Sequence, residues 1–176
     1  HGRPARVCYN AVDSDYYRPT GLPRSDRFLF LARFSAIKGA DLAIEACRKA
    51  GVGLDLVGDT TITHEPEFFA RCQAMCDGTQ IRMVGPATRS ECVHWFSRAR
   101  CLLHPNQRFR EPFGLAPVEA LACGLPVIAW NYGALRETMP HHDGGGPAWL
   151  VNSLDEMVSI IRNINAPDVP SREGSA

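Results

Sequence analysis

The sequence lacks the marks of several common protein classes. Its 19 Lys and Arg residues balance 19 Asp and Glu residues, so no basic excess points to nucleic acid or an anionic membrane surface. No apolar run approaches the about 18 residues of a membrane-spanning helix, and no signal peptide opens the chain, so we expect a cytoplasmic protein. Neither a G-x-G-x-x-G after a strand pattern nor a G-x-S-x-G is present, which argues against nicotinamide dehydrogenases and serine hydrolases.

The cysteines show no disulfide or metal pattern. There are seven, an odd number, scattered through helix and strand patterns, which is typical of reduced core residues in an intracellular protein. Cys72 and Cys76 would share one helix face, while His64, His94 and His104 lie elsewhere in the chain. Structural zinc usually takes two compact clusters of such ligands. The sequence therefore predicts a packed helix face, with no metal and no cofactor.

Apolar patterning predicts alternating strands and helices, which is typical of a parallel sheet with helices on both faces. With right-handed crossovers this is an α/β fold, a single Rossmann-like domain. The expected strands are 6–9, 27–32, 54–57, 81–84, 101–103, 125–130 and 148–151, and the expected helices are 40–49, 66–76, 89–99, 115–122 and 153–164.

The domain organisation follows from composition. We expect residues 26–164 to form the Rossmann-like domain and residues 165–176, which carry Pro, Ser and Gly without periodicity, to be a disordered tail. Residues 1–25 are interpreted as an interdomain linker and the edge of a missing N-terminal domain. An ordinary frayed N-terminus is the alternative for this segment.

The chain is organised around the stretch from Glu111 to Trp130, which shows the pattern of a loop, a helix and a buried strand. A helix that starts after Gly114 exposes free backbone N–H groups at the positive end of its dipole, where phosphate can bind. Glu111 and Glu119 bracket this start. The apolar positions expected to face inward are Leu115, Val118, Leu121 and Ala122.

Two glutamates also raise the possibility of a glycosidase pair. If both were helical, eight residues at about 1.5 Å each would separate their backbones by about 12 Å. A retaining pair needs about 5–5.5 Å and an inverting pair about 6.5–9.5 Å. The spacing therefore favours two contacts on one extended ligand.

Glu111 to Glu119 forms an E-x7-E motif, flanked by Phe113-Gly114-Leu115, Glu119-Ala120-Leu121-Ala122 and Gly124-Leu125-Pro126-Val127. In this order, the run resembles retaining glycosyltransferases of the glycogen synthase and sucrose synthase type (glycosyltransferase family four, group 1), which have the two-domain GT-B fold. The resemblance covers about residues 6–164 and implies the C-terminal, donor-binding half of such an enzyme.

Candidate site residues gather at the carboxyl ends of the expected strands, where ligands bind in open α/β sheets. Arg33, Gly58, Gly85, His104 and the 105–115 loop all fall there. Arg33 and Lys38 could stabilise charge on a diphosphate, although two solvated cations are the alternative reading.

The resemblance implies a role for each residue. Arg33, Lys38, Gly114 and Leu115 would bind the donor diphosphate, Glu119 the ribose, and Glu111 with Phe113 the sugar. Val84, Gly85 and Pro86 would lie against the nucleobase. Glu111, Arg33 and Lys38 would be the catalytic residues, without a metal.

The implied function is transfer of a sugar, with retention, from a nucleotide diphosphate-sugar to an acceptor. The alternative is a nucleotide-sugar-binding module without catalysis of its own. An upstream Rossmann-like half in the full-length gene would favour the enzyme, and this chain alone is expected to be inactive.

Overall fold

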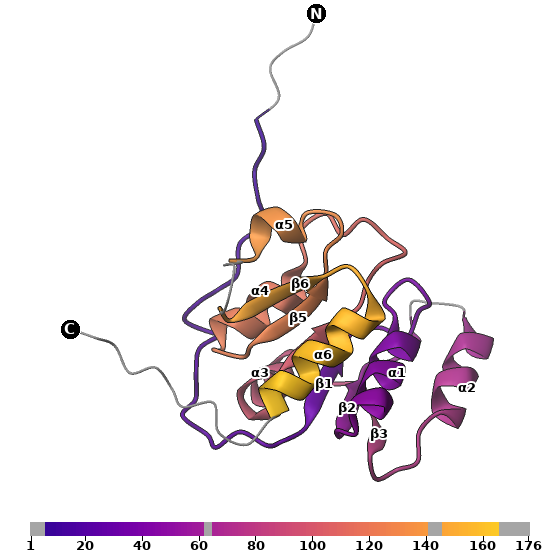
Figure 1. The fold of residues 1–176 in the computed structure, drawn as a ribbon. Helices are drawn as coiled ribbons and strands as arrows, with labels where there is room; N and C mark the ends of the chain where they lie inside the picture. The colour runs from indigo at the N-terminus through magenta and orange to yellow at the C-terminus, as the bar shows by residue number, and fades with distance from the viewer. Residues whose placement is uncertain (1–5, 62–64, 141–145, 166–176) are drawn as a thin grey trace, which may run out of the picture.

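The computed structural model describes residues 6–61, 65–140 and 146–165. Strands and helices alternate along these ranges, as the sequence predicts (Figure 1). In chain order the elements are β1 (Phe28–Leu31), α1 (Ala40–Ala50), β2 (Leu54–Val57), α2 (Pro66–Ala74), β3 (Ile81–Gly85), α3 (Arg89–Arg98), β4 (Leu102–His104), α4 (Leu115–Ala122), β5 (Val127–Trp130), α5 (Leu135–Thr138), β6 (Ala148–Val151) and α6 (Leu154–Asn165).

The six strands form one parallel sheet in the order β3-β2-β1-β4-β5-β6. The chain moves outward from β1 to β3, then crosses back to β4 and moves outward in the other direction. The reversal lies between β1 and β4, which is the point where Rossmann-like sheets of this order bind their ligands. The predicted Rossmann-like α/β fold is confirmed.

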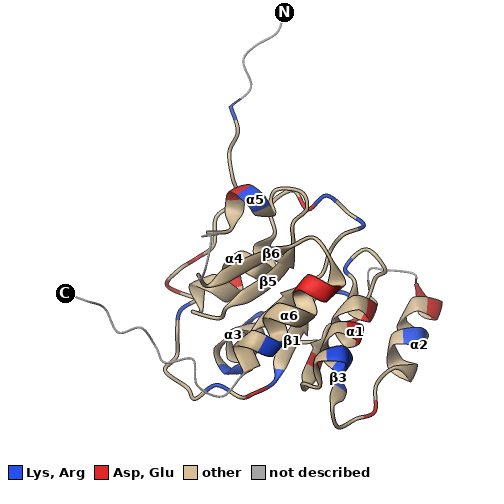
Figure 2. Ribbon diagram, viewed as in Figure 1, with Lys and Arg blue, Asp and Glu red and all other residues tan. Residues whose placement is uncertain are grey.

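Helices cover both faces of the sheet, because consecutive strand residues point to opposite sides. In β1, Phe28 and Phe30 belong to a core with α1, α2 and α6, whereas Leu29 belongs to a core with α3, α4 and α5. Figure 1 shows α1 and α6 side by side over the first of these faces. Lys, Arg, Asp and Glu are interleaved along the ribbon (Figure 2), as a net charge of zero would suggest.

Local capping signals fix several helix ends. Thr88 accepts a hydrogen bond from the Glu91 N–H (3.3 Å), and the Glu91 carboxylate accepts one from the Thr88 N–H (2.7 Å), which together form a capping box at the start of α3. Gly51 ends α1 in the left-handed conformation, and Gly124 takes the same conformation after α4.

The predicted strand at 6–9 is wrong. These residues pair with no strand, and Val7 and Tyr9 are 80% and 55% exposed. The pattern was apolar, but the segment lies beside neither edge strand, β3 or β6, and so has no strand to pair with. Cys8 is exposed as well, unlike Cys47, Cys72, Cys101 and Cys123, which are buried free thiols as expected.

Two helix faces differ from expectation. In α4 the buried residues are Pro117 and Ala120, and Leu115 is 45% exposed, because the helix packs through a stripe that continues to Cys123. In α2 the buried residues are Phe68 and Cys72. Phe69 is half-buried and packs on the ring of Phe34, with ring centroids 5.2 Å apart. Apolar spacing alone did not distinguish these neighbouring faces.

Part of the segment expected to be a linker packs on this domain. Tyr17 is 4% exposed and lies 6.4 Å from the ring of Phe96 in α3. Arg24 donates hydrogen bonds to the carbonyls of Phe96 (3.2 Å), Ala99 (3.0 Å) and Gly124 (2.6 Å). The domain boundary at residue 25 stays a prediction, and the expected tail lies outside the described residues apart from Asn165, which ends α6.

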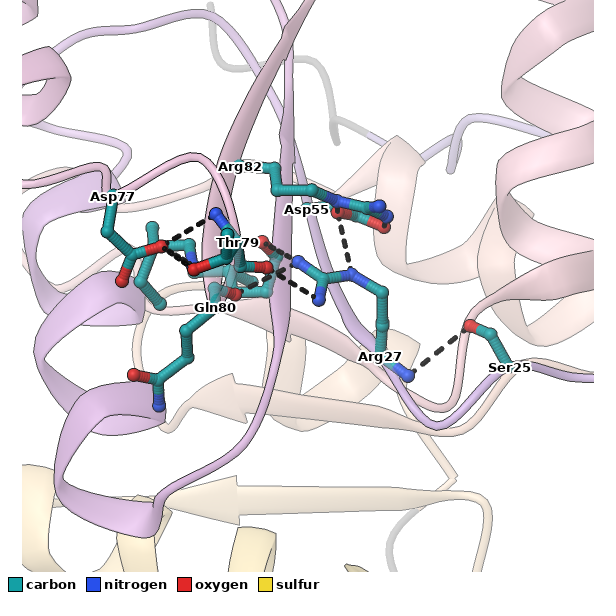
Figure 3. A network of polar contacts seen from close by, with 9 residues as sticks. Ser25, Arg27, Asp55, Asp77, Thr79, Gln80 and Arg82 are labelled. Carbon is teal, nitrogen blue, oxygen red and sulfur yellow. Dashed lines mark hydrogen bonds and ion pairs between the residues drawn. The ribbon is translucent and has the colours of Figure 1, made fainter.

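Near the amino ends of the strands, Arg27, Asp55 and Arg82 form what we call the Asp55 network (Figure 3). Asp55, 5% exposed, accepts hydrogen bonds from Arg27 Nε (2.9 Å) and from Arg82 Nε and its terminal nitrogen (2.7 and 2.8 Å). Arg27 donates onward to the carbonyls of Leu54 (2.8 Å) and Gln80 (2.9 Å). The network ties β1, β2 and β3 together.

Candidate functional site

A cavity of about 480 Å³ opens between the carboxyl ends of β1 and β4, where the strand order reverses. We call it the switch-point cavity. It is formed by Leu31 at the end of β1, by residues 32, 33 and 38 after that strand, by His104, by the 111–114 loop and by the exposed side of α4. Asn10 of the N-terminal segment completes the lining.

The structure brings most of the predicted site residues together here. The switch-point cavity is lined by Arg33, Lys38, Glu111, Phe113, Gly114, Leu115 and Glu119. Val84, Gly85 and Pro86 are not among its lining residues. They lie at the end of β3 and just beyond it, where the Gly85 carbonyl accepts a hydrogen bond from the Gly58 N–H after β2 (2.8 Å). Both sets of residues lie on the side of the sheet where the strands have their carboxyl ends, and their roles stay predictions.

The start of α4 faces this cavity through Gly114, which precedes the first helical residue with φ 86°. Only glycine adopts this conformation readily, and a Cβ added there would also lie 2.5 Å from Leu135 Cδ2. No side chain among the described residues caps the helix. Its first N–H groups therefore remain suited to an anion.

An ion pair lies at the centre of the site. Lys38 Nζ lies 2.6 Å from Glu111 Oε2, and both side chains are only 15% exposed. Asn106 Nδ2 donates to the same oxygen (3.0 Å), and Asn106 is 1% exposed. The ring of Phe109 lies beside Lys38, with its centroid 5.9 Å from Nζ. The Glu111 carboxylate is thus held by one cation and one amide.

His104 lies against the same carboxylate, with Nε2 3.9 Å from Glu111 Oε2. Burial, aided by nearby Lys38 and opposed by Glu111, lowers the pKa of His104 to about 4. The imidazole is therefore neutral at physiological pH. Within the described part of the chain, His104 Nε2 and Asn106 Oδ1 are buried without a hydrogen-bond partner. Buried polar atoms usually have partners, so a bound ligand could supply them.

Arg33 is half-buried in the cavity and makes no hydrogen bond or ion pair to other described residues. With Lys38 and the start of α4 it surrounds a space suited to a group with two or more negative charges. His104 was noted in the sequence only for its position after a strand, and Asn106 fell within a loop. Their contacts with Glu111 depend on how the 104–111 segment turns back, which spacing does not show.

Glu119 lines the same cavity one turn inside α4 and is half-buried. It lies beside the hydroxyl of Tyr17, whose pKa is raised mainly by burial and further by Glu119, against the opposite effect of Arg89. Arg89 lies over the rings of Tyr16 and Tyr17, 4.5 and 5.5 Å from their centroids. The N-terminal segment therefore borders the predicted ribose contact.

The described ranges lack two kinds of feature. No group of three or more His, Cys, Asp or Glu residues in those ranges is placed to hold a metal ion. No helix in them combines the length and apolarity that crossing a membrane requires.

The sheet order and the cavity at its switch point, lined by two cations and two carboxylates, define a Rossmann-like α/β domain with a candidate ligand site. Residues 18–163 match the family described as glycosyl transferases group 1. The chain belongs to this family.

Individual relatives agree on the fold. The chain is 27% identical over 175 residues to D-inositol 3-phosphate glycosyltransferase of Frankia alni, covering 84% of this chain and 42% of the relative. It superposes on Anabaena HepE in complex with UDP and glucose with a TM-score of 0.74 and 23% identity, over 90% of this chain and 46% of that one.

A third similarity shows which part of the fold this is. The C-terminal domain of a Francisella tularensis glycosyl transferase group 1 family protein superposes with a TM-score of 0.67 and 19% identity, over 88% of this chain and 87% of that one. The chain thus spans less than half of the Frankia relative and of HepE. Its fold is that of the C-terminal half of a GT-B glycosyltransferase.

Proposed function

We propose that this chain is the donor-binding half of a retaining glycosyltransferase, which transfers a sugar from a nucleotide diphosphate-sugar to an acceptor. The observation that carries the proposal is the switch-point cavity, which unites Arg33, Lys38 and the start of α4 around Glu111. The similarity to a solved protein that holds UDP and glucose supports a nucleotide-sugar ligand. Sugar transfer itself is supported by the family and by the Frankia relative.

The diphosphate lies between the two cations and the N–H groups at the start of α4, from Gly114 and Leu115. Charge that builds on the departing diphosphate is stabilised by groups already fixed in place. Arginine offers a forked pair of donors and lysine a compact charge. This arrangement needs no metal and no cofactor.

The remaining donor groups extend along the carboxyl edge of the sheet. Glu119 accepts hydrogen bonds from the ribose hydroxyls, and the nucleobase lies towards residues 84–86. In the other direction, Glu111 and Phe113 contact the sugar. An extended nucleotide-sugar therefore spans the edge from β3 to β4.

Donor binding exchanges the contacts of Lys38. In this structure Lys38 is paired with Glu111 at 2.6 Å. A diphosphate beside Arg33 attracts the ammonium group, and the carboxylate is then available to a sugar hydroxyl. Asn106, which donates to Glu111 Oε2, keeps the carboxylate in place during the exchange.

The second candidate is a nucleotide-sugar-binding module without catalysis. The observation that favours it is coverage, since the chain spans 42% of the Frankia relative and 46% of HepE. Transfer requires acceptor and donor in near-attack geometry, which supplies much of the rate. We place the acceptor wall mainly in a partner domain upstream in a cytoplasmic enzyme, and expect no useful transfer from the 176-residue chain alone.

The test is a calorimetric titration of the chain with UDP-, GDP- and ADP-sugars, in magnesium and in excess chelator. We expect saturable binding of one base series, with the same affinity in both buffers. Absence of binding to all three series would contradict the proposed function, and a hundredfold loss in chelator would contradict metal independence. Steady sugar transfer by the isolated chain would contradict the need for an upstream domain.

A further inference from the structure

The segment that carries both cations of the site is held by charged side chains from elsewhere in the chain. Lys38 N–H donates to the Ser35 carbonyl (2.9 Å), which closes a turn shortly after Arg33. We call residues 33–38 the 33–38 loop, and it lies between β1 and α1. The positions of both cations therefore depend on what holds this loop.

Glu65, just before α2, binds the 33–38 loop with both carboxylate oxygens. Its Oε1 accepts a hydrogen bond from the Ser35 hydroxyl (2.7 Å), and its Oε2 accepts one from the Ala36 N–H (2.8 Å). Ser35 is only 1% exposed. The Ala36 N–H and then the Ser35 hydroxyl lower the pKa of Glu65, so the carboxylate is charged at physiological pH.

The helix that follows Glu65 does not explain this arrangement. Glu65 is the residue before the first helical residue, Pro66, and its side chain makes no capping hydrogen bond to α2. Glutamate is not among the residues preferred at such a position. The Glu65 carbonyl accepts the Phe69 N–H (3.1 Å), so the backbone supports α2 while the side chain binds the 33–38 loop.

Arg108 binds the other polar group of the Ala36 backbone. Its Nη1 donates to the Ala36 carbonyl (2.7 Å), and the same nitrogen lies 3.5 Å from Asp41 Oδ2 in the first turn of α1. Arg108 belongs to the loop that leads from β4 to Glu111. The turn is thus bound through Ala36 from two separate segments of the chain.

A fixed turn matters because Lys38 has to change partners. Its Nζ lies 2.6 Å from Glu111 Oε2, and in the proposed function it moves to the diphosphate. Lysine already loses much side-chain freedom when it binds a ligand. If the backbone of the turn also had to be ordered on binding, the affinity would fall further, and a turn that is ordered beforehand avoids this cost.

We propose that Glu65 and Arg108 are positioning residues for the donor diphosphate, which hold the 33–38 loop so that Lys38 can bind phosphate. The proposal rests on the proposed function, because Glu65 and Arg108 act through Lys38 and are assigned no contact with the ligand.

The sign of the effect distinguishes positioning from simple electrostatics. A carboxylate near a diphosphate repels it, so by charge alone the removal of Glu65 would tighten binding. Loss of positioning would weaken binding instead. The two explanations therefore predict opposite changes in the Kd of the diphosphate.

The experiment titrates UDP, GDP and ADP into the unmodified chain and continues with the one that binds most tightly and with its nucleoside. In Glu65→Ala the diphosphate Kd should rise at least fivefold, while the nucleoside Kd stays within twofold. In Glu65→Gln the amide can still accept from the Ala36 N–H and donate to the Ser35 oxygen. The diphosphate Kd of this variant should stay within twofold of that of the unmodified chain.

The matched control is Glu67→Ala, which removes the same charge from an exposed position in the first turn of α2. Its diphosphate Kd should stay the same or fall. A double-mutant cycle adds Lys38→Ala, and in this background Glu65→Ala should raise the diphosphate Kd less than twofold, since the residue through which Glu65 acts is gone.

Arg108→Gln is the second variant, and it decides the question if Glu65→Ala does not fold. The Arg108 side chain is 41% exposed, and the diphosphate Kd should rise at least threefold. Its control is Arg71→Gln, because Arg71 is 60% exposed and lies 3.3 Å from the same Asp41 oxygen. The control should change the diphosphate Kd less than twofold.

An unchanged or lower diphosphate Kd in Glu65→Ala would overturn the proposal. So would an equal loss of nucleoside affinity, a Glu65→Gln variant as weak as Glu65→Ala, a full effect in the Lys38→Ala background, or equal Kd values in Arg108→Gln and Arg71→Gln. In each case diphosphate binding by the unmodified chain would leave the proposed function standing. Failure of UDP, GDP and ADP to bind the unmodified chain would contradict both.

Discussion

Asp55, near the amino end of β2, and Glu111, in the loop after β4, both carry largely buried carboxylates, yet their surroundings differ. Asp55 uses both oxygens and is bound by two arginines, of which Arg27 also donates to backbone carbonyls. The hydrogen bonds and ion pairs of the Glu111 carboxylate all converge on Oε2, and beside it His104 and Asn106 keep polar atoms without partners among the described residues. The first cluster is complete in itself, whereas we propose that a ligand completes the second.

The largest expected effect comes from breaking the complete cluster. Asp55→Ala leaves Arg27 without its carboxylate, although the Arg27 side chain is only 18% exposed. Removing one partner of a buried ion pair typically costs about 3–5 kcal/mol. We expect a loss of this size in the free energy of unfolding, measured by urea denaturation.

The control for that variant is Asp155→Ala, whose side chain is 92% exposed and which lies 4.0 Å from Lys49. It should leave the free energy of unfolding almost unchanged. If Asp55→Ala lowered the free energy of unfolding by less than about 1 kcal/mol, the Asp55 network would not stabilise the fold as a buried ion pair does.

Substitutions near Glu111 should change ligand binding. Arg33→Ala and Lys38→Ala should each weaken nucleoside diphosphate binding by about 1.5–3 kcal/mol, the usual value of a charge-assisted hydrogen bond. Binding of the nucleoside alone should change much less. Calorimetric titration measures both, with Lys49→Ala, 47% exposed and outside the switch-point cavity, as the control.

If the diphosphate bound the Arg33→Ala/Lys38→Ala double variant as tightly as the unmodified chain, the assignment of these cations to phosphate would be wrong. The residues around Glu111 would then have no ligand-binding role to distinguish them from the Asp55 network.

A smaller effect should appear in the pH dependence of stability. The pKa of His104 is lowered from 6.5 to about 4 in the folded state, mainly by burial. Between these values the unfolded chain binds the proton and the folded chain does not, so stability falls as pH falls through this interval. The slope from one such group is at most about 1.4 kcal/mol per pH unit.

The measurement compares denaturation at pH 7, 6 and 5 for the unmodified chain and for His104→Gln. The variant should lose this part of the slope, whatever its stability at pH 7. As a control, His94→Gln, at an exposed position, should keep the slope. An unchanged slope in His104→Gln would show that His104 does not resist protonation in the fold.

Much of the fold could be predicted, because its signals are local. The capping box at Thr88, the glycine after α1 and the continuous apolar strands depend on a few neighbouring residues. Alternation of strands and helices then left few possible topologies. The strand expected at 6–9 failed because a strand also needs a neighbouring strand to pair with, which no local pattern reveals.

The site was predictable in composition but not in arrangement. Arg33, Lys38 and Glu111 were marked by their position after strands and by the E-x7-E run. The Asp55 network was not, because it depends on the register that places Asp55 opposite Arg82 in neighbouring strands. The contacts of His104 and Asn106 with Glu111 likewise require the three-dimensional path of the loop.

The distribution of the seven free cysteines gives the protein a chemical asymmetry. Cys72 and Cys123 have pKa values raised to about 12 and 11, mainly by burial, and Cys47 and Cys101 are fully buried. Thiolates react and thiols hardly do, so these four groups resist alkylation while the domain stays folded. Cys8 is exposed one residue before Tyr9, whose ring lies 6.5 Å from that of Phe113 at the switch-point cavity. A maleimide dye would therefore attach first beside the site, and later labelling of the buried thiols would report the opening of the sheet.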